Sequence, residues 1–390
     1  MNKYKVYVYA ICKNEEQFVD LWMDCMNEAD GVFVLDTGSE DRTVEKLIAR
    51  GAIVKIEIIN PWRFDIARNI SLQMVPEYAD ICVCTDMDER FEPGWRTLLE
   101  TNWIPGADKA LYTYNWSLKP DGTPDTQLVY SKIHRRNSYI WKYPVHEYLK
   151  FIGTGTENTV DLRQLILNHY PDMNKSRRSY LTLLKIGVQE DPTDERMAYY
   201  LGREYMYIGN WNECISTLLL HLTLPHSVWP EERAASMRWI AKAYQMLGDT
   251  AQAYLWYFRA IAECPYMRDA YVEFALMAYN ISDWNAAYYF SEEALKITRK
   301  NTTFVNMGYA WDHTPNDIAS LACWNLGLHK KALEHAKKAL AISPIDKRLR
   351  ENVRLMEGFL LTEAATAEPV PAEKADLQET ALTGLYTVPV

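Results

Sequence analysis

Hydrophobic positions in the first part of the chain form short runs that are separated by amphipathic segments. Residues 5–12 (KVYVYAIC) alternate as a half-buried strand does. Later runs also predict strands, at 31–39, 52–59 and 79–88. The intervening segments carry apolar residues at helical spacing and predict helices, at 13–29, 41–51 and 65–75. Because strands alternate with helices, we expect a parallel sheet that binds ligands at the carboxyl ends of its strands.

Carboxylates stand where two of these strands should end. Asp36 closes the second strand, and Asp86 and Asp88 close the fourth, just before a turn at Pro93. Oxygen ligands of this kind suit hard cations such as Mg²⁺ or Mn²⁺, which also bridge phosphate oxygens. An isolated Asp-x-Asp is more often a solvated acidic turn, so the interpretation depends on further motifs.

From about residue 175 the pattern changes to long, aromatic-rich helical segments without strands. Repeated units consist of a helix, a short polar turn and a second helix, at a spacing near the tetratricopeptide period of about 34 residues. Such units stack into a solenoid. The end of the chain mixes Ala, Glu, Pro and Thr with little periodicity and predicts a mobile tail. We therefore expect an α/β domain at 1–172, helical repeats at 173–362 and a tail at 363–390.

Composition narrows the function classes. The net charge of −10 argues against general nucleic-acid binding, which requires a basic surface. The seven cysteines lack the paired spacing of zinc sites, and their odd number in apolar segments favours reduced thiols and a cytoplasmic setting. No run of about 18 apolar residues predicts a transmembrane span.

Six short motifs follow one another in a fixed order: AICKNEE (10–16), VLDTGSEDRT (34–43), FDIARNISL (64–72), CTDMDE (84–89), YPVHEYL (143–149) and LNHYPD (167–172). Together they resemble the family 2 glycosyltransferases of GT-A fold, especially the subgroup with C-terminal tetratricopeptide-like repeats. The resemblance extends to about residue 340. It implies a Rossmann-like, nucleotide-sugar-binding GT-A domain followed by an all-α tetratricopeptide-like solenoid.

The resemblance also implies roles at the nucleotide end of the site. Asp36 would bind the base or ribose of the nucleotide. The region around Asn14 and Glu15 would line the same pocket, and Arg68 would contact the nucleotide. Taken alone, Asp36 is equally typical of a helix cap or turn, and Arg68 of an exposed helix face.

The diphosphate end would be held by a metal ion. The resemblance assigns Asp86 and Asp88 to the metal and diphosphate, and His169 to completing the metal shell. Mn²⁺ or Mg²⁺ would stabilise the leaving diphosphate as a Lewis acid. Arg135, within the basic stretch 134–136, would add an electropositive lip for the diphosphate or belong to a solvated turn.

The stretch 143–149 holds the candidate base. Inversion at the anomeric carbon requires a group that takes the acceptor's proton on the face opposite the diphosphate. Glu147 is the first candidate and His146 the second, while Glu89 would orient neighbours or contact the sugar. The alternative is structural, with His146 capping a turn and Glu147 paired to a nearby cation.

The sequence thus predicts an inverting, metal-dependent glycosyltransferase that uses a nucleotide sugar, and the resemblance favours UDP over GDP or dTDP. The acceptor stays open among saccharide, peptide and modified nucleobase, and the repeats would bind it or a second copy of the chain. Two alternatives remain. One is a tetratricopeptide scaffold with a non-catalytic transferase-like domain. The other is a nucleotidyltransferase, which would normally carry a Gly-rich phosphate loop that residues 10–16 lack.

Overall fold

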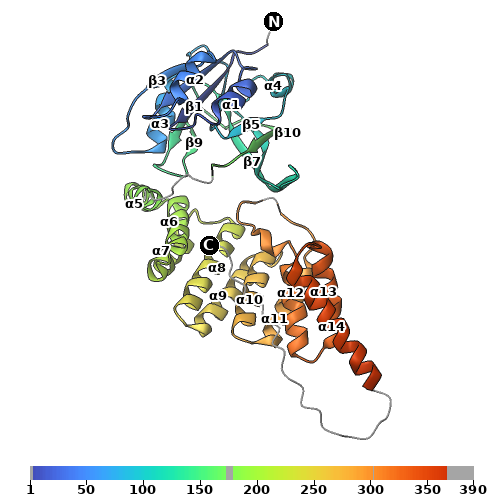
Figure 1. Ribbon diagram of the computed structural model, residues 1–390. Coiled ribbons are helices and arrows are strands. Elements are labelled where there is room, and N and C mark those ends of the chain that lie inside the picture. Colours follow the sequence, from blue (N-terminus) through green and yellow to red (C-terminus); the bar gives the residue numbers. More distant parts are fainter. Residues whose placement is uncertain (1–2, 173–178, 302, 367–390) are drawn as a thin grey trace. The chain divides into compact units, whose positions relative to one another are not determined.

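The computed structural model describes residues 3–172, 179–301 and 303–366. The chain divides into two compact units, the first ending at Pro192 and the second beginning at Thr193, with a short segment at 302–304 grouped with the first (Figure 1). Helix α5 (Tyr180–Glu190) belongs to the first unit, so the boundary expected at residue 172 falls before it. The predicted tail, 363–390, lies mostly outside the described residues.

The first unit is built on an eight-stranded mixed sheet with the order β3-β2-β1-β4-β7-β6-β10-β5. Its strands are β1 (Val6–Cys12), β2 (Gly31–Asp36), β3 (Ile53–Ile56), β4 (Ile81–Cys84), β5 (Glu89–Phe91), β6 (Lys109–Leu118), β7 (Pro124–Arg135) and β10 (Thr159–His169). The first four strands pair in parallel, as predicted. Strand β7 is antiparallel to β4 and β6, while β6 is parallel to β10. The carboxyl ends of β1, β2, β4, β6 and β10 therefore lie along one edge.

Helices cover both faces of this sheet. They are α1 (Val19–Met26), α2 (Thr43–Ala49), α3 (Phe64–Met74) and α4 (Trp95–Asn102). Because side chains alternate along a strand, β1 faces two cores. Val8 packs in a cluster with Trp22 of α1 and Trp95 of α4, whereas Tyr9 packs with Leu72 of α3. A second, two-stranded sheet pairs β8 (Tyr139–Lys142) with β9 (Tyr148–Phe151).

Helix α1 begins later than the predicted segment 13–29. The backbone N–H groups of Asn14 and Glu15 donate to Ser39 Oγ (2.8 Å) and Thr43 Oγ1 (2.7 Å) instead of entering a helix. Asn14 also has a positive φ of 55°, which a helix cannot accommodate. Side chains after β2 thus hold the loop after β1.

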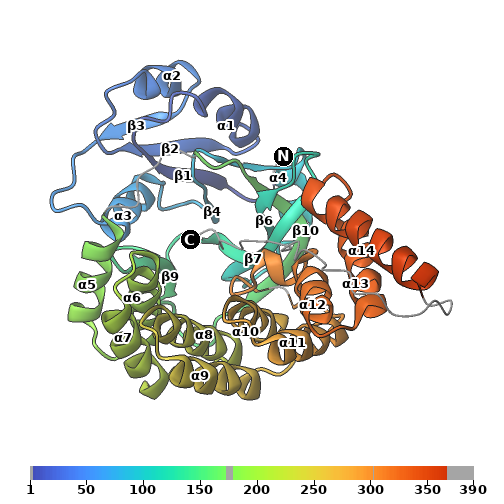
Figure 2. The ribbon, with the colours of Figure 1, turned by 60° about the horizontal axis from the view of Figure 1, so that its bottom comes forward.

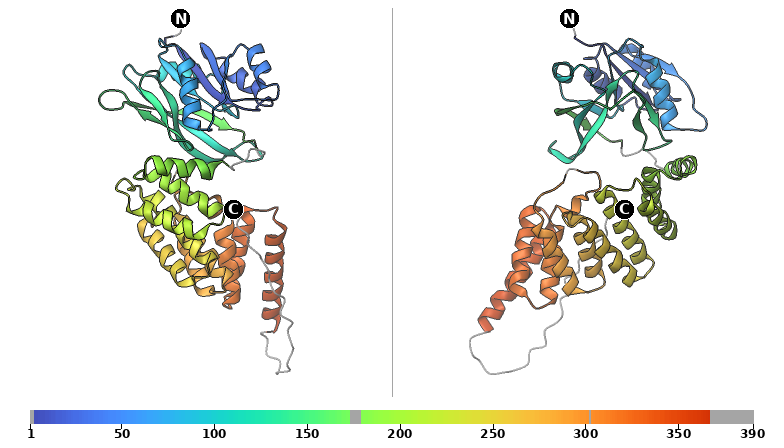
Figure 3. Two further views of the ribbon diagram at one scale, coloured as in Figure 1. Left: turned by 90° about the vertical axis from the view of Figure 1, so that its left-hand side faces the viewer. Right: turned by 180° about the vertical axis from the view of Figure 1, so that it is seen from behind.

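The second unit consists of antiparallel helix pairs that stack side by side, in agreement with the predicted helical repeat (Figure 3). Its helices are α6 (Glu195–Tyr207), α7 (Trp211–Thr223), α8 (Pro230–Met246), α9 (Thr250–Glu263), α10 (Arg268–Asn280), α11 (Trp284–Lys296), α12 (Thr314–Asn325), α13 (His329–Ile342) and α14 (Lys347–Thr366), with a 3₁₀ turn η1 (Gly308–Ala310). The side chains of Asp194, Asp249 and Asp283 cap the amino ends of α6, α9 and α11, respectively. No described helix is both long and apolar enough to cross a membrane.

The close approach of α6 to α7 generates a stability prediction. A Cβ added to Gly202 would lie 2.3 Å from Cδ2 of Leu218, which is fully buried. We expect Gly202→Ala to lower the free energy of unfolding by about 1–3 kcal/mol, the usual cost of overpacking. Gly358→Ala is the matched control, since nothing lies within 4 Å of its added Cβ. This control should gain up to about 1 kcal/mol from helix propensity. Urea denaturation measures both, and equal stabilities for the two variants would contradict the packing.

Candidate functional site

The carboxyl edge of the sheet gathers most of the residues that the motifs single out. Asp36 is the last residue of β2, Asp86 and Asp88 follow β4, and His169 ends β10. His169 is paired with Glu89, the first residue of β5, across an antiparallel ladder. The topology therefore brings together residues that are far apart in the sequence.

Asp86 lies between two buried cations. Its Oδ1 accepts a hydrogen bond from Nη2 of Arg68 at 2.8 Å, and its Oδ2 accepts one from Nζ of Lys132 at 3.1 Å. Arg68 and Lys132 are 4% and 7% exposed. Burial by itself raises the pKa of Asp86, but these two cations outweigh it and hold that pKa well below its ordinary value. Asp86 is therefore a fixed carboxylate at the rim of the site.

Arg68 connects Asp86 to the stretch 143–149. Its Nε donates to Oε1 of Glu147 at 2.5 Å, and its guanidinium lies 5.0 Å from the ring centroid of Trp141. The arginine thus meets two carboxylates, which offsets the large cost of burying its charge. This arrangement places Glu147 beside Asp86, as the motifs predict for residues of one site.

Glu89 occupies the interior of the same network. Its Oε1 accepts from the hydroxyl of Tyr114 at 2.8 Å and lies 3.4 Å from Nζ of Lys132, while Oε2 accepts the backbone N–H of Asp86 at 2.9 Å. Burial raises its pKa above the ordinary value, although Lys132 opposes the shift. With 2% of its surface exposed, Glu89 orients Asp86 and is not placed to contact a substrate.

Asp88 and His169 form a second, distinct pair. Nε2 of His169 lies 3.6 Å from Oδ2 of Asp88, and both side chains are largely buried. Nδ1 of His169 is 3.0 Å from the carbonyl oxygen of Trp116, so we assign the proton to Nδ1, because a carbonyl can only accept. A carboxylate also only accepts, so the protonated ring is the form that can donate from Nε2 toward Asp88. Burial alone would lower the pKa of His169, but Asp88 and the Trp116 carbonyl raise it above its ordinary value.

The predicted nucleotide end is a compact loop structure. Oxygens of Asp36 accept from the backbone N–H groups of Gly38 (3.1 Å) and Ser39 (3.0 Å) and from the Ser39 hydroxyl (2.5 Å). Oδ1 of Asn14 accepts the N–H of Glu40 at 2.8 Å. The structure thus brings Asp36 and Asn14 together, along with the neighbouring Glu15. In this state Asp36 caps its own turn.

The stretch 143–149 has a strained backbone. Tyr143 and His146 have positive φ angles of 85° and 52°, which are uncommon for residues other than glycine. The ring of His146 meets Tyr180 of α5 edge-on at 5.6 Å. The carbonyl of Pro144 accepts the N–H of Phe64 at the start of α3. These contacts fix the loop that carries His146 and Glu147.

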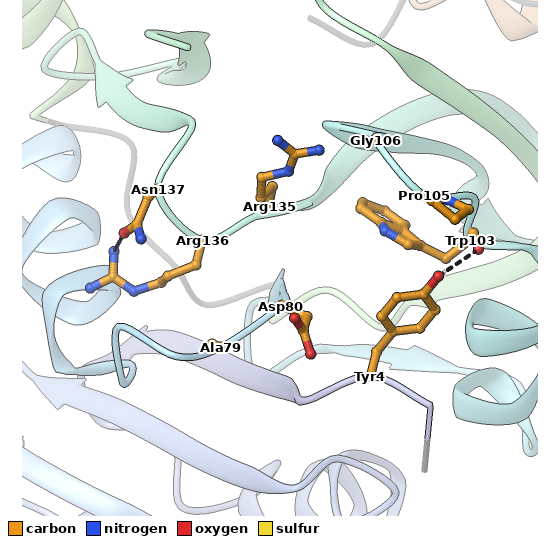
Figure 4. Close-up of a pocket in the computed structure, with 9 residues that line it drawn as sticks. All are labelled: Tyr4, Ala79, Asp80, Trp103, Pro105, Gly106, Arg135, Arg136 and Asn137. Carbon is orange, nitrogen blue, oxygen red and sulfur yellow. Dashed lines mark hydrogen bonds between the residues drawn. The ribbon is translucent and has the colours of Figure 1, made fainter. Parts of the chain in front are cut away.

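The structure does not bring Arg135 to this edge, and that part of the prediction is wrong. Strand β7 runs antiparallel to β4, so Arg135 pairs with Ile81 at the opposite end of β4. Arg135 there donates to the carbonyl of Ala107 and lies 3.5 Å from Asp108. It lines a surface pocket of about 290 Å³ at the amino edge of the sheet (Figure 4). The other residues of that pocket are Tyr4, Ala79, Asp80, Trp103, Pro105, Gly106, Arg136 and Asn137. This pocket therefore lies away from the carboxyl edge and is not evidence for a binding site there.

The three predicted metal ligands, Asp86, Asp88 and His169, fall into two groups with different partners. Within the described ranges, no group of three or more His, Cys, Asp or Glu side chains is arranged so that it could hold a metal ion. Asp86 faces Arg68 and Lys132, whereas Asp88 faces His169.

Lys132 and Tyr114 are members of the network that the motifs do not identify. Lys132 lies near the end of β7, where it and the next two residues, Ile133 and His134, are buried. A lysine at such a position indicates a buried carboxylate partner, but the sequence does not say which one.

Comparisons with known proteins concern mainly helical repeats. No protein-family model matches the chain, and no curated protein matches its sequence. A crystal structure of MamA is similar at 22% identity, covering 45% of this chain and 96% of that one, with a TM-score of 0.36. TTC0263, a thermophilic TPR protein of Thermus thermophilus, has 16% identity over 46% of this chain and 90% of its own, with a TM-score of 0.32. The hetero-tetramer Cut9–Hcn1 of the APC/C has 15% identity over 48% and 34%, with a TM-score of 0.37. Such weak likenesses assign no activity or partner.

The buried network predicts that the stability of the first unit depends strongly on Lys132. Lys132→Met would leave Asp86 and Glu89 without their shared cation, and breaking a buried ion pair from one side costs about 3–5 kcal/mol. Lys109→Met is the matched control, because its pair with Glu157 is partly exposed and should contribute only about 0–1 kcal/mol. Urea denaturation measures both variants. If Lys132→Met costs no more than the control, the buried network does not stabilise the edge.

Proposed function

We propose that the first unit is an inverting, metal-dependent glycosyltransferase of GT-A fold, similar to family 2, which moves a sugar from a nucleotide sugar, with UDP favoured, to an acceptor. The observation that carries the proposal is the convergence of Asp88, His169 and the Asp86 network at the carboxyl edge of a partly parallel sheet. Ligands of open α/β sheets bind at this edge.

The Asp88–His169 pair fits a divalent cation. Ligand bonds of about 2.0–2.2 Å place two neighbouring ligand atoms on one ion roughly 3 to 4 Å apart. The separation of 3.6 Å between Nε2 of His169 and Oδ2 of Asp88 lies in that range. The bond from Nδ1 of His169 to a backbone carbonyl is the support that metal-binding histidines commonly have. Mg²⁺ typically takes one or two protein ligands, and substrate phosphates and water fill the rest.

A metal held by Asp88 and His169 would supply Lewis-acid stabilisation of the departing diphosphate. The chain itself contributes a preorganised surround. Arg68 and Lys132 fix Asp86 from both sides, so that its carboxylate is held in place before substrate arrives. Glu89 anchors the backbone N–H of Asp86 and sets the course of the turn that carries Asp88.

Glu147 is the proposed base. Arg68 binds its Oε1 and thereby holds the carboxylate in one orientation beside Asp86. A general base has to present a fixed, deprotonated oxygen toward the acceptor hydroxyl. His146, the adjacent residue in the same strained loop, is the second candidate.

The alternative is a helical-repeat scaffold whose first unit binds a nucleotide without catalysis. One observation favours it: Asp86 and Glu147 are both neutralised by Arg68, and a purely structural network would have the same contacts. A nucleotidyltransferase remains a weaker alternative, because residues 10–16 contain no glycine to form a phosphate loop.

Calorimetric titration of UDP-glucose with and without Mn²⁺, followed by hydrolysis assays over a panel of sugar nucleotides, distinguishes these functions. The proposal expects metal-dependent binding and slow release of free sugar from at least one donor. Binding without sugar release from any donor would favour the scaffold. Release of pyrophosphate from a nucleoside triphosphate in the presence of a sugar phosphate would indicate a nucleotidyltransferase.

Removal of the metal ligand provides the next prediction. Asp88→Ala should abolish Mn²⁺-dependent donor hydrolysis and leave the fold intact, because the carboxylate is half of the ligand pair. Asp125→Ala is a suitable control, since Asp125 lies on an exposed stretch of β7 and accepts from Ser117. Unchanged metal-dependent turnover in Asp88→Ala, with circular dichroism like that of the wild type, would rule out this metal site.

The base assignment has a separate test. Glu147→Gln keeps the shape of the side chain and an oxygen for Arg68 but cannot accept a proton. Sugar transfer should fall by about 10²–10⁴-fold, the range typical of general-base catalysis, while donor affinity changes little. His146→Ala should reduce transfer less. Transfer at the normal rate in Glu147→Gln would remove Glu147 as the base and make His146 the next candidate.

A further inference from the structure

A segment between α11 and α12 lies on the inner side of the second unit's helices (Figure 2). It comprises residues Val305–Trp311 and includes the 3₁₀ turn η1, which packs against α10 and α12. It interrupts the helix-pair repeat, in which the inner side is formed by the first helix of each pair. The segment therefore fills a place that the repeat alone would leave open.

Helices α8 and α10 contact the main chain of this segment through charged side chains. Arg238 of α8 donates from Nη2 to the carbonyl oxygen of Val305 at 3.0 Å. Asp269 of α10 accepts the N–H of Met307 at 2.5 Å. Two side chains of the helices thus hydrogen-bond a main-chain carbonyl and a main-chain N–H that are two residues apart. Peptide-binding grooves hold the main chain of an extended peptide in the same way.

Side chains of the segment are also held at defined positions. The hydroxyl of Tyr309 donates to Oε1 of Glu273 at 2.8 Å. Arg268 approaches the Ala310 carbonyl at 3.5 Å, and its guanidinium lies 4.2 Å from the ring centroid of Trp311. Val305 and Ala310 are buried. Two buried apolar side chains, one hydroxyl and one indole ring therefore accompany the main-chain contacts.

The charges beneath the segment are deeply buried. Arg238 and Asp269 expose 2% and 1% of their side chains, and Glu273 bonds to Arg238. Burial raises the pKa of Asp269 and of Glu273, although Arg238 opposes both shifts. One oxygen of Asp269, Oδ2, has no hydrogen-bond partner among the described residues. Buried ion pairs rarely stabilise more than apolar packing does, so these charges indicate recognition of a polar main chain.

We propose that the inner faces of α8, α10 and α12 form a peptide-binding groove, and that residues 305–311 of this chain are its built-in occupant. The occupant keeps the groove closed to other peptides. Arg238 and Asp269 bind the main chain of any such segment, and Glu273 selects a hydroxyl-bearing side chain at the position of Tyr309. This inference is independent of the activity proposed for the first unit.

The test supplies the segment in trans. Residues 305–311 are replaced by a Gly/Ser linker of equal length in the full chain, and a fluorescein-labelled peptide copying residues 303–313 is titrated by fluorescence anisotropy. The variant should bind the peptide about tenfold or more tightly than the wild type does. Adding Arg238→Met to the variant, or replacing the peptide's Tyr309 by Phe, should weaken binding. A folded variant that binds the peptide no better than the wild type overturns the proposal.

Hydrogen exchange in the unmodified protein keeps the proposal testable if the linker variant does not fold. A displaceable occupant opens without its groove, so the amide of Met307 should exchange about tenfold or more faster than the interior amides of α10. Exchange of Met307 at the same rate as those of α10 would make the segment a fixed part of the core and would overturn the proposal.

Discussion

Neutralisation of Asp86 by two buried cations is the interaction on which the first unit's carboxyl edge depends. An ionised carboxylate, a guanidinium and an ammonium are each costly to remove from water, and they become tolerable together because each satisfies the others. Arg68 comes from α3, Lys132 from β7 and Asp86 from the turn after β4. The network thus joins three elements that pack around the end of one strand, and it fixes the turn that leads to Asp88.

The turn after β4 also positions Asp88 against the end of β10. The carbonyl of Asp88 accepts the N–H of Tyr170, and its carboxylate faces His169 at the end of β10. Asp86 and Asp88 are only two positions apart, but they have different partners. Asp86 is bound to protein cations, while Asp88 has an imidazole partner of the kind that divalent metals share. The proposed transferase chemistry depends on this difference between the partners of Asp86 and Asp88.

The parallel part of the fold could be predicted from the sequence because its signals are local. Strands β1 to β4 are short apolar runs that alternate with amphipathic helices, and the ends of β2 and β4 are marked by Asp36 and Asp86. The sequence does not predict the strands after α4. Strand β7, for example, has mixed polar and apolar residues, and its outer half is largely exposed. The placement of Arg135 failed for a related reason. Its nearness in sequence to other motif residues says nothing about strand direction, and antiparallel pairing carries it to the far edge.

Long-range partners account for the rest of what the sequence could not show. Lys132 can be buried because its ammonium group pairs with the carboxylates of Asp86 and Glu89. Glu89 can be buried because Tyr114 and Lys132 hydrogen-bond its carboxylate. The late start of α1 likewise depends on Ser39 and Thr43, which lie in another loop. Such choices are set by tertiary contacts and leave no periodic signal in the chain.

The central claim is that the carboxyl edge binds a metal-supported nucleotide through Asp88 and His169 while Asp86 stays with its cations. Crystals grown with Mn²⁺ and UDP, measured at the manganese absorption edge, test it most directly. The account predicts an anomalous peak within about 2.0–2.3 Å of an Asp88 oxygen and of Nε2 of His169. Arg68 and Lys132 should still contact Asp86 in that structure. A peak elsewhere, or bound UDP with no peak beside Asp88 and His169, would contradict the account.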